Sequence, residues 1–176
     1  MITLGVELSN IKTQRASVIP YTIRDGVMYY LLGVHSETGD ITDFGGGVKK
    51  SENSLYSAAR EWKEETKGVF GSDLYNINNM LLNVAVYDKN MALLFVPINN
   101  KWIDTANFTF QSITPLKKDN QEISSLRWYT HTQFMNLLKH RSRLWDRIRR
   151  FYVKEFNQDM FKLLNACFCY HSRHTA

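Results

Sequence analysis

The sequence predicts one α/β (α+β) domain in which a mixed β-sheet is flanked by helices. Two observations predict this class: two hairpin patterns lie on either side of one amphipathic helix, and helical periodicity replaces strand patterns after Thr130. The 176 residues suit a single core, and 44% of them are hydrophobic, which excludes a disordered or fibrous chain. We therefore expect residues 1–176 to form one domain that ends in a basic helical segment, about 131–176.

The first hairpin is predicted near the N-terminus. Apolar and polar residues alternate over 16–19, apolar residues dominate 27–32, and Asp25-Gly26 lies between them. Asp-Gly between two such runs is the strongest short-range hairpin signal. The other predicted strands are residues 81–86 and 91–96, which would form a second hairpin around residues 88–90, and residues 123–129.

A helix is predicted over residues 54–67, directly after a glycine-rich loop at residues 43–47. Its apolar positions recur with the 3.6-residue period of a helix; they are Leu55, Ala58, Ala59 and Trp62. Either Ser51 or Asn53 is a suitable N-cap, because both side chains carry an oxygen that accepts from a backbone N–H.

Two more helices are predicted after Thr130, over residues 134–139 and 144–156. The second has an apolar stripe, which consists of Leu144, Ile148, Phe151, Tyr152 and Phe156. Beyond it, two cysteines and two histidines fall within eight residues, at Cys167, Cys169, His171 and His174. Their spacings are too short for a zinc site, so we expect a frayed tail with reduced thiols.

The positive charge of the chain is concentrated in its last quarter. Residues 131–176 carry nine basic and three acidic residues, so the segment is +6; the whole chain is +5, which leaves −1 for residues 1–130. One basic stripe follows helical spacing and consists of Arg143, Arg147, Arg150 and Lys154. It is either a solvated helix face or a surface that binds a polyanion such as RNA.

Three carboxylates share one face of the helix predicted over residues 54–67. Glu61, Glu64 and Glu65 lie at i, i+3 and i+4, and like charges at these spacings repel by a few tenths of a kcal/mol. A hard divalent cation would remove that repulsion. The alternative is a solvated face on which Arg60 pairs with Glu64.

The spacing around these carboxylates resembles the Nudix box. Gly46 is followed by five residues and Glu52, and then by seven residues and Arg60-Glu61-Trp62-Lys63-Glu64-Glu65. The family pattern is G-x5-E-x7-R-E-U-x-E-E-x-G-U, where U is a bulky apolar residue. The match runs from Gly46 to Gly68 and departs from the pattern at Lys67, which replaces the second glycine. Phe44 also stands where a proline often precedes the glycines.

The resemblance implies a Nudix-type α/β/α sandwich and a metal site. Glu61, Glu64 and Glu65 would bind Mg²⁺ or Mn²⁺, with the Gly46 carbonyl as a further ligand. Glu52 would orient this cluster, although the helical projection does not place it on the Glu61 face. Arg60 would hold the carboxylates by salt bridges.

The resemblance also identifies a second catalytic position. An extra glutamate often precedes a strand that ends in tryptophan, and residues 122–128 resemble that segment. Glu122 is therefore either the general base or a metal ligand, or else an exposed loop glutamate.

The expected function is metal-dependent hydrolysis of a diphosphate linkage in a nucleotide-containing substrate, with the mRNA cap or RNA 5′ end as the first substrate to consider. Dinucleoside polyphosphates, nucleoside triphosphates and inositol pyrophosphates are alternatives. Two other classes are a non-catalytic Nudix-fold binding module and a nucleic-acid-binding protein in which the box is incidental. No stretch approaches the roughly 20 apolar residues of a membrane span, so we expect an intracellular, cytoplasmic protein. The sequence does not indicate the oligomeric state.

Overall fold

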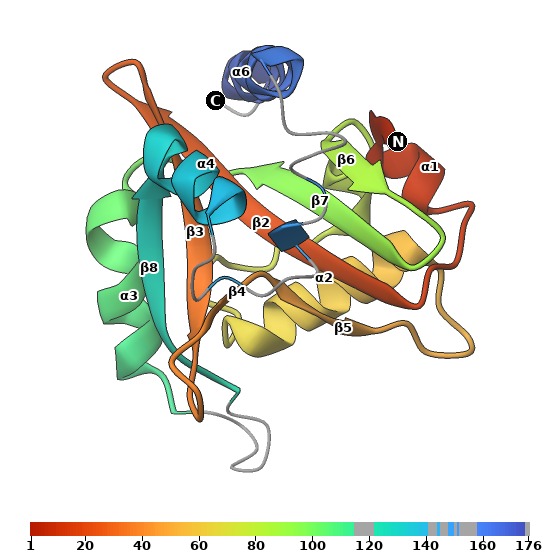
Figure 1. Ribbon diagram of the computed structural model, residues 1–176, viewed down its shortest axis with the longest axis horizontal. Coiled ribbons are helices and arrows are strands. Elements are labelled where there is room, and N and C mark those ends of the chain that lie inside the picture. Colours follow the sequence, from red (N-terminus) through yellow and green to blue (C-terminus); the bar gives the residue numbers. More distant parts are fainter. Residues whose placement is uncertain (115–121, 141–143, 145–147, 150, 152–157, 175–176) are drawn as a thin grey trace.

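The computed structural model describes residues 1–114, 122–140, 144, 148–149, 151 and 158–174 (Figure 1). The elements are β1 (Ile2–Leu4), α1 (Gly5–Leu8), β2 (Arg15–Arg24), β3 (Val27–His35), β4 (Ile41–Thr42), β5 (Phe44–Gly47), α2 (Ser54–Glu65), a 3₁₀ turn (Ile77–Asn79), β6 (Val84–Tyr87), β7 (Met91–Pro97), α3 (Trp102–Ser112), β8 (Ile123–Thr130), α4 (His131–Lys139) and α6 (Gln158–His174).

The eight strands of the described residues form one mixed sheet, in the order β1-β6-β7-β2-β3-β4, with β5 paired to β2 and β8 paired to β3. The β2–β7 pair is parallel, and the other named pairs are antiparallel. The long strand β2 joins the two parts of the sheet, because its first residues pair with β5 and β7 and its last residues pair with β3. The predicted mixed sheet is confirmed.

Both predicted hairpins are present. In the first, Asp25 and Gly26 connect β2 to β3 with φ values of 53° and 76°, the left-handed pair that a tight hairpin turn requires. In the second, β6 pairs with β7 from Ala85 opposite Leu94 to Tyr87 opposite Ala92. The strand at Ile123–Thr130 is also confirmed.

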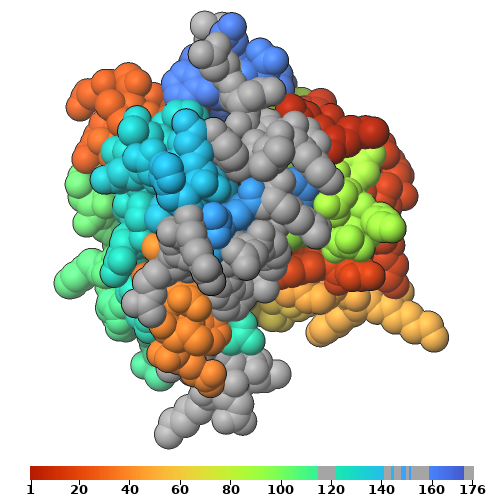
Figure 2. Space-filling model, in the orientation of Figure 1, coloured from red at the N-terminus to blue at the C-terminus, as the bar shows by residue number. Residues whose placement is uncertain are grey.

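Helices cover both faces of the sheet (Figure 1). One buried cluster joins the sheet to α2 and α3, and a second joins its other face to α4 and α6. In Figure 2, α4 and the tip of the β2–β3 hairpin form part of the visible face, with α6 above them. The three layers of the predicted sandwich are confirmed.

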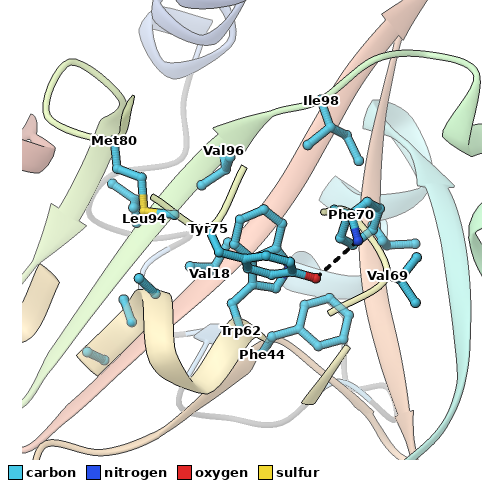
Figure 3. Packing of buried hydrophobic residues seen from close by; sticks show 14 of the residues in the cluster. Val18, Phe44, Trp62, Val69, Phe70, Tyr75, Met80, Leu94, Val96 and Ile98 are labelled. Carbon is cyan, nitrogen blue, oxygen red and sulfur yellow. Dashed lines mark hydrogen bonds between the residues drawn. The ribbon is translucent and has the colours of Figure 1, made fainter. Parts of the chain in front are cut away.

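Trp62 is the centre of the cluster that holds α2 against the sheet (Figure 3). Its side chain is fully buried, and its ring centroid lies 4.6 Å from that of Tyr75 and 5.5 Å from that of Phe70. The Tyr75 hydroxyl accepts from the Phe70 backbone N–H at 3.3 Å. Close aromatic contacts of this kind stabilise a core beyond simple area burial, so the last turn of α2 has a fixed position.

The C-terminal tail was predicted incorrectly as frayed. Residues Gln158–His174 form helix α6, which buries Met160 and Leu164 against the sheet. The two residues lie at i and i+4, so they share one face of the helix. Burial of this face stabilises the helix, which the spacing of the cysteines and histidines did not predict.

The prediction of a helix over 144–156 falls largely outside the described residues. Of its apolar stripe, Leu144, Ile148 and Phe151 are buried in the second cluster, as expected, and Tyr152 and Phe156 lie outside the described part. Within the described ranges, each helix is too short or too polar to cross a membrane.

Candidate active site

Helix α2 begins at Ser54 because Asn53 caps it. Asn53 is extended, with φ −85° and ψ 171°, and its Oδ1 accepts from the Tyr56 backbone N–H at 2.8 Å. This bond satisfies one of the N–H groups that every helix start leaves unpaired. Of the two predicted caps, Asn53 is therefore the one used.

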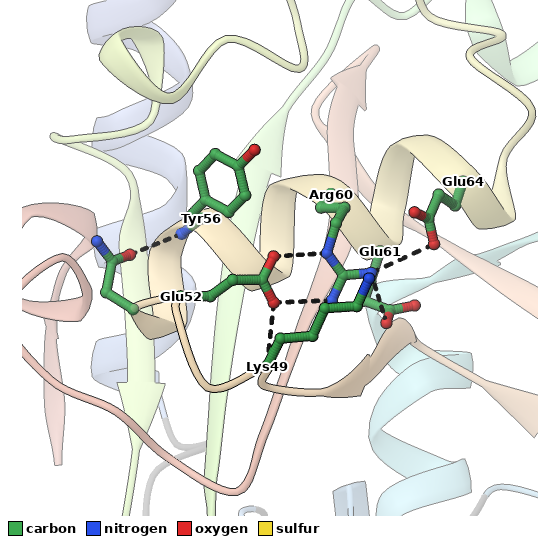
Figure 4. Close-up of polar contacts among 7 residues, drawn as sticks. Lys49, Glu52, Tyr56, Arg60, Glu61 and Glu64 are labelled. Atoms are coloured by element: carbon green, nitrogen blue, oxygen red, sulfur yellow. Dashed lines mark hydrogen bonds and ion pairs between the residues drawn. The ribbon is translucent and has the colours of Figure 1, made fainter.

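Arg60 links three carboxylates along one side of α2 (Figure 4). Its guanidinium donates to both oxygens of Glu52, at 2.6 Å and 2.9 Å, and to Glu61 Oε1 at 3.0 Å and Glu64 Oε2 at 3.3 Å. The bidentate pair with Glu52 is the geometry in which arginine binds carboxylates most specifically. The predicted salt-bridge role of Arg60 matches these contacts.

Glu52 reaches this group through the loop that precedes α2. Its Oε1 also accepts from the Lys49 backbone N–H at 3.0 Å, which fixes the carboxylate beside the helix. Chiefly the hydrogen bonds from Arg60 hold the pKa of Glu52 below its ordinary value. The loop therefore brings Glu52 to the carboxylates of α2, although the helical projection did not place it on the Glu61 face.

Glu61 and Glu65 lie in a less favourable environment for a negative charge. Burial, above all, raises the pKa of both groups, and for Glu65 the negative charges of Asp43 and Glu61 raise it further. Glu65 Oε2 is shielded from solvent and has no hydrogen-bond partner among the described residues. A buried carboxylate oxygen in this state costs free energy unless a cation or a proton joins it.

A buried ion pair lies beside Glu65 that the sequence did not single out. Arg15 donates to both oxygens of Asp43, at 2.8 Å and 2.9 Å, and Asp43 is almost fully buried. The positive charge of Arg15 lowers the pKa of Glu65, in opposition to Asp43. The two residues are 28 positions apart, so no local spacing could have paired them; the only signal was the place of Asp43 at the start of the glycine-rich loop.

Glu122 lies just before β8 and is exposed. Its backbone carbonyl accepts from the Ser36 N–H at 2.7 Å, which joins its chain position to the end of β3. Its negative charge contributes to the raised pKa of both Glu61 and Glu65. The fold thus brings Glu122 within electrostatic reach of the α2 carboxylates, although 57 residues separate it from Glu65 in sequence.

The glycines of β5 allow two close approaches. A Cβ on Gly46 would lie 2.5 Å from Glu61 Oε1, so the backbone there lies directly against the carboxylate. A Cβ on Gly45 would lie 2.5 Å from the Ala16 carbonyl oxygen, where β5 pairs with β2. Side chains at either position would displace their neighbours.

The donor set of this site fits a hard divalent cation. The candidate ligands offer only oxygen, the donor that Mg²⁺ and Mn²⁺ prefer; they are Glu61, Glu64, Glu65, Glu122 and the Gly46 carbonyl. A cation would also give Glu65 Oε2 the partner that it lacks among the described residues. Among the described residues, no three His, Cys, Asp or Glu side chains form a ready-made metal site, and Arg60 engages Glu61 and Glu64. These contacts of Arg60 do not include the remaining candidate donors, which are Glu65, Glu122 and the Gly46 carbonyl.

The predicted basic stripe lies outside the described residues; its members are Arg143, Arg147, Arg150 and Lys154. The cysteines of the tail are free, and the described part of the chain offers no metal cluster around them.

Comparison with solved structures identifies the fold. A MutT/Nudix family protein from Listeria innocua aligns with a TM-score of 0.52 at 15% identity, covering 88% of this chain and 98% of that chain. A C. elegans Ap4A hydrolase aligns with a TM-score of 0.43 at 14% identity, covering 91% and 98% of the two chains. No protein-family model matches the sequence, and no curated protein matches it. The chain has the Nudix fold.

The two glycines predict different effects for the same substitution. Gly45→Ala should destabilise the fold, by about 1–3 kcal/mol or more, because the new methyl group meets backbone. Gly46→Ala should destabilise it less, because the Glu61 side chain can move away, but should weaken Mn²⁺ binding by displacing that carboxylate. Urea unfolding and Mn²⁺ titration of both variants separate the effects. Equal destabilisation by both substitutions would contradict this account.

Proposed function

We propose that this protein is a hydrolase of the Nudix type that cleaves a diphosphate linkage with the help of Mg²⁺ or Mn²⁺. The observation that supports it most is the state of Glu65: its Oε2 is buried beside further carboxylates and has no hydrogen-bond partner in the described part of the chain. A structural role alone gives no reason to keep such a group, whereas a cation site does. The residues at this site occupy the positions of the box that the sequence resembles.

The residues of the site would bind the cation or orient its ligands. A bound divalent cation would supply an activated water and stabilise the negative charge that develops on the phosphoryl oxygens. Glu61, Glu64 and Glu65 would hold it, with the Gly46 carbonyl as a further ligand. Arg60 would hold the carboxylates by salt bridges, and Glu52 would orient the cluster through its bidentate contact with Arg60.

Glu122 is the proposed general base or an additional ligand. A carboxylate that stays exposed and near the cluster is suited to take a proton from water, because solvent can then accept it in turn. Its exposure also keeps open the alternative in which it is an ordinary loop glutamate.

We propose a nucleotide-containing substrate, first of all capped or 5′-phosphorylated RNA. The support for RNA is the charge of residues 131–176, which carry +6, because a basic surface binds a phosphate backbone. Dinucleoside polyphosphates, nucleoside triphosphates and inositol pyrophosphates are the competing substrates. Release of phosphate or nucleotide from such a panel, with and without Mg²⁺ or Mn²⁺, tests the proposal, and no hydrolysis of any member would favour a binding module.

The basic stripe provides the prediction on substrate class. Replacing Arg143 and Arg147 by Ala should weaken binding of capped RNA about equally for all sequences. It should also reduce the salt dependence of binding by roughly one unit of slope per lost phosphate contact. Hydrolysis of a free cap dinucleotide should be unchanged, because a diphosphate at α2 need not reach that segment. The measurement is binding and turnover of both substrates at two or more salt concentrations.

A matched control removes the same charge elsewhere. Lys89 and Lys101 are exposed and lie outside the basic segment, so their double Ala variant should bind capped RNA nearly as wild type does. Equal losses on RNA and on the free dinucleotide would instead favour a compact polyphosphate substrate. No loss on either would return the stripe to a solvated helix face.

A further inference from the structure

Lys67 adopts a backbone conformation that ordinarily favours glycine. It follows the C-cap of α2 with φ 57°, in the left-handed region. The Gly68 N–H donates to the Lys63 carbonyl at 2.9 Å and the Lys67 N–H to the Glu64 carbonyl at 3.2 Å, the two bonds of a Schellman motif. A residue with a Cβ costs free energy in this conformation, and the side-chain contacts of Lys67 offset this cost.

The side chain of Lys67 caps a different helix. Its ammonium donates to the carbonyls of Phe110 at 3.2 Å and Ile113 at 3.0 Å, and it lies 4.0 Å from the centre of the Phe110 ring. These carbonyls belong to the last turn and the C-cap of α3. A cation is favoured there by the helix dipole and by the ring face. Lys67 therefore ties the end of α2 to the end of α3.

Helix α3 in turn holds the start of β8. Gln111 Nε2 donates to the Ser124 carbonyl at 2.8 Å, and Asn107 Oδ1 accepts from the Leu126 backbone N–H at 2.9 Å. Glu122 lies two residues before Ser124. The contacts therefore run from the last turn of α2, through Lys67 and α3, to the strand that carries Glu122.

We propose that Lys67 is a positioning residue that sets where Glu122 lies relative to Glu64 and Glu65. This inference rests on the proposed function for its catalytic consequence. The two box carboxylates are in the last turn of α2, immediately before Lys67, so any shift of α3 relative to α2 changes their distance to Glu122. Glycine at this position would keep the Schellman motif and lose the tie.

The test compares Lys67→Gly with Lys67→Arg, using the substrate of the panel that wild type hydrolyses. Lys67→Gly should lower kcat by roughly 10- to 100-fold with a smaller change in KM, because small misplacements of a catalytic group are costly. Lys67→Arg keeps a cation at this position, so its kcat should stay close to that of wild type. Lys67→Gly should also have little further effect in a Glu122→Gln background, because both changes then act through the same group.

Amide hydrogen exchange gives a readout that needs no substrate. The Ser36 amide donates to the Glu122 carbonyl, so it should exchange at least roughly 10-fold faster in Lys67→Gly. The amides of Thr22 and Tyr29, which are paired in the register of the first hairpin, should be unchanged. Exchange therefore tests the structural part of the inference even if the wild-type protein hydrolyses no substrate. Absence of hydrolysis would overturn the proposed function and the catalytic consequence, but not the structural role of Lys67.

Three results would overturn the inference. The first is wild-type exchange at Ser36 in Lys67→Gly. The second is a loss of kcat in Lys67→Gly that is equally large with Gln at position 122. The third is normal turnover in Glu122→Gln together with defective turnover in Lys67→Gly, which would mean that Lys67 acts without Glu122.

Discussion

Glu65→Gln is expected to lower kcat by at least roughly 10²-fold while leaving the fold intact, and Glu64→Gln is expected to do the same. The amide keeps the shape of the side chain and removes the negative charge that a divalent cation requires. Because the cation supplies several kcal/mol of charge stabilisation in such reactions, loss of one ligand should reduce the rate by this much. Replacing Glu52 should cost less, because its contacts are with Arg60 and the Lys49 backbone.

Glu65→Gln should also make the metal-free protein more stable at neutral pH. Burial and neighbouring carboxylates raise the pKa of Glu65 in the folded state, whereas the unfolded value is about 4.3. As the pH rises past that value, Glu65 loses its proton in the unfolded state but keeps it in the folded state. The free energy of unfolding of wild type therefore falls until the pH passes the pKa of Glu65 in the folded state. Glutamine carries no such cost, and below about pH 4 the advantage of the variant should vanish.

Steady-state kinetics at saturating Mg²⁺ and urea unfolding across pH measure the two effects. Glu7→Gln, on α1, is the matched control and should be near wild type in both experiments. Near-normal turnover of Glu64→Gln and Glu65→Gln would rule out the metal assignment. If metal-free Glu65→Gln were less stable than wild type at pH 7, the charged form of Glu65 would not be destabilising the fold.

Glu122→Gln is expected to lower kcat by about 10²- to 10⁴-fold, with a smaller effect on KM. Proton transfer by a positioned carboxylate contributes this much to catalysis. The structure gives the physical basis: the charge of Glu122 reaches Glu61 and Glu65. The kinetics should be measured across pH, because loss of a general base changes the pH profile as well as the rate.

Glu37 provides the control for Glu122. It is exposed and follows Ser36, whose amide bonds to the Glu122 backbone, so it samples the same region of the surface. Glu37→Gln should have wild-type kinetics. If Glu122→Gln also had wild-type kinetics, the base would be one of the box glutamates and Glu122 an exposed loop residue.

Local patterns predicted the elements whose stability is local. The Asp25-Gly26 turn fixes the first hairpin through its two left-handed residues, and Asn53 and Trp62 together define the start and the buried face of α2. Once that helix is predicted, its periodicity places the carboxylates of Glu61, Glu64 and Glu65 on one face. Turn chemistry and periodicity are visible in sequence because they involve residues only a few positions apart.

Long-range packing determined what the patterns did not reveal. Strand β5 contains three glycines, which disfavour strands, and it forms because Gly45 lies directly against β2. Helix α3 was not predicted, since its aromatic and β-branched residues are poor helix formers, and it depends on burial of Ala106 and Phe110. The Arg15–Asp43 pair and the contact of Lys67 with α3 join distant segments, so spacing in the sequence could not indicate them.

A Mn²⁺ titration of stability, with wild type and Glu65→Gln side by side at pH 7, tests the central claim most directly. A cation that binds only the folded state should raise the unfolding free energy of wild type by about 2.7 kcal/mol at 100 times its dissociation constant. The same Mn²⁺ concentrations should leave Glu65→Gln nearly unchanged and should stabilise the Glu7→Gln control as they do wild type. Equal stabilisation of wild type and Glu65→Gln, or none of either, would contradict a metal site at this helix.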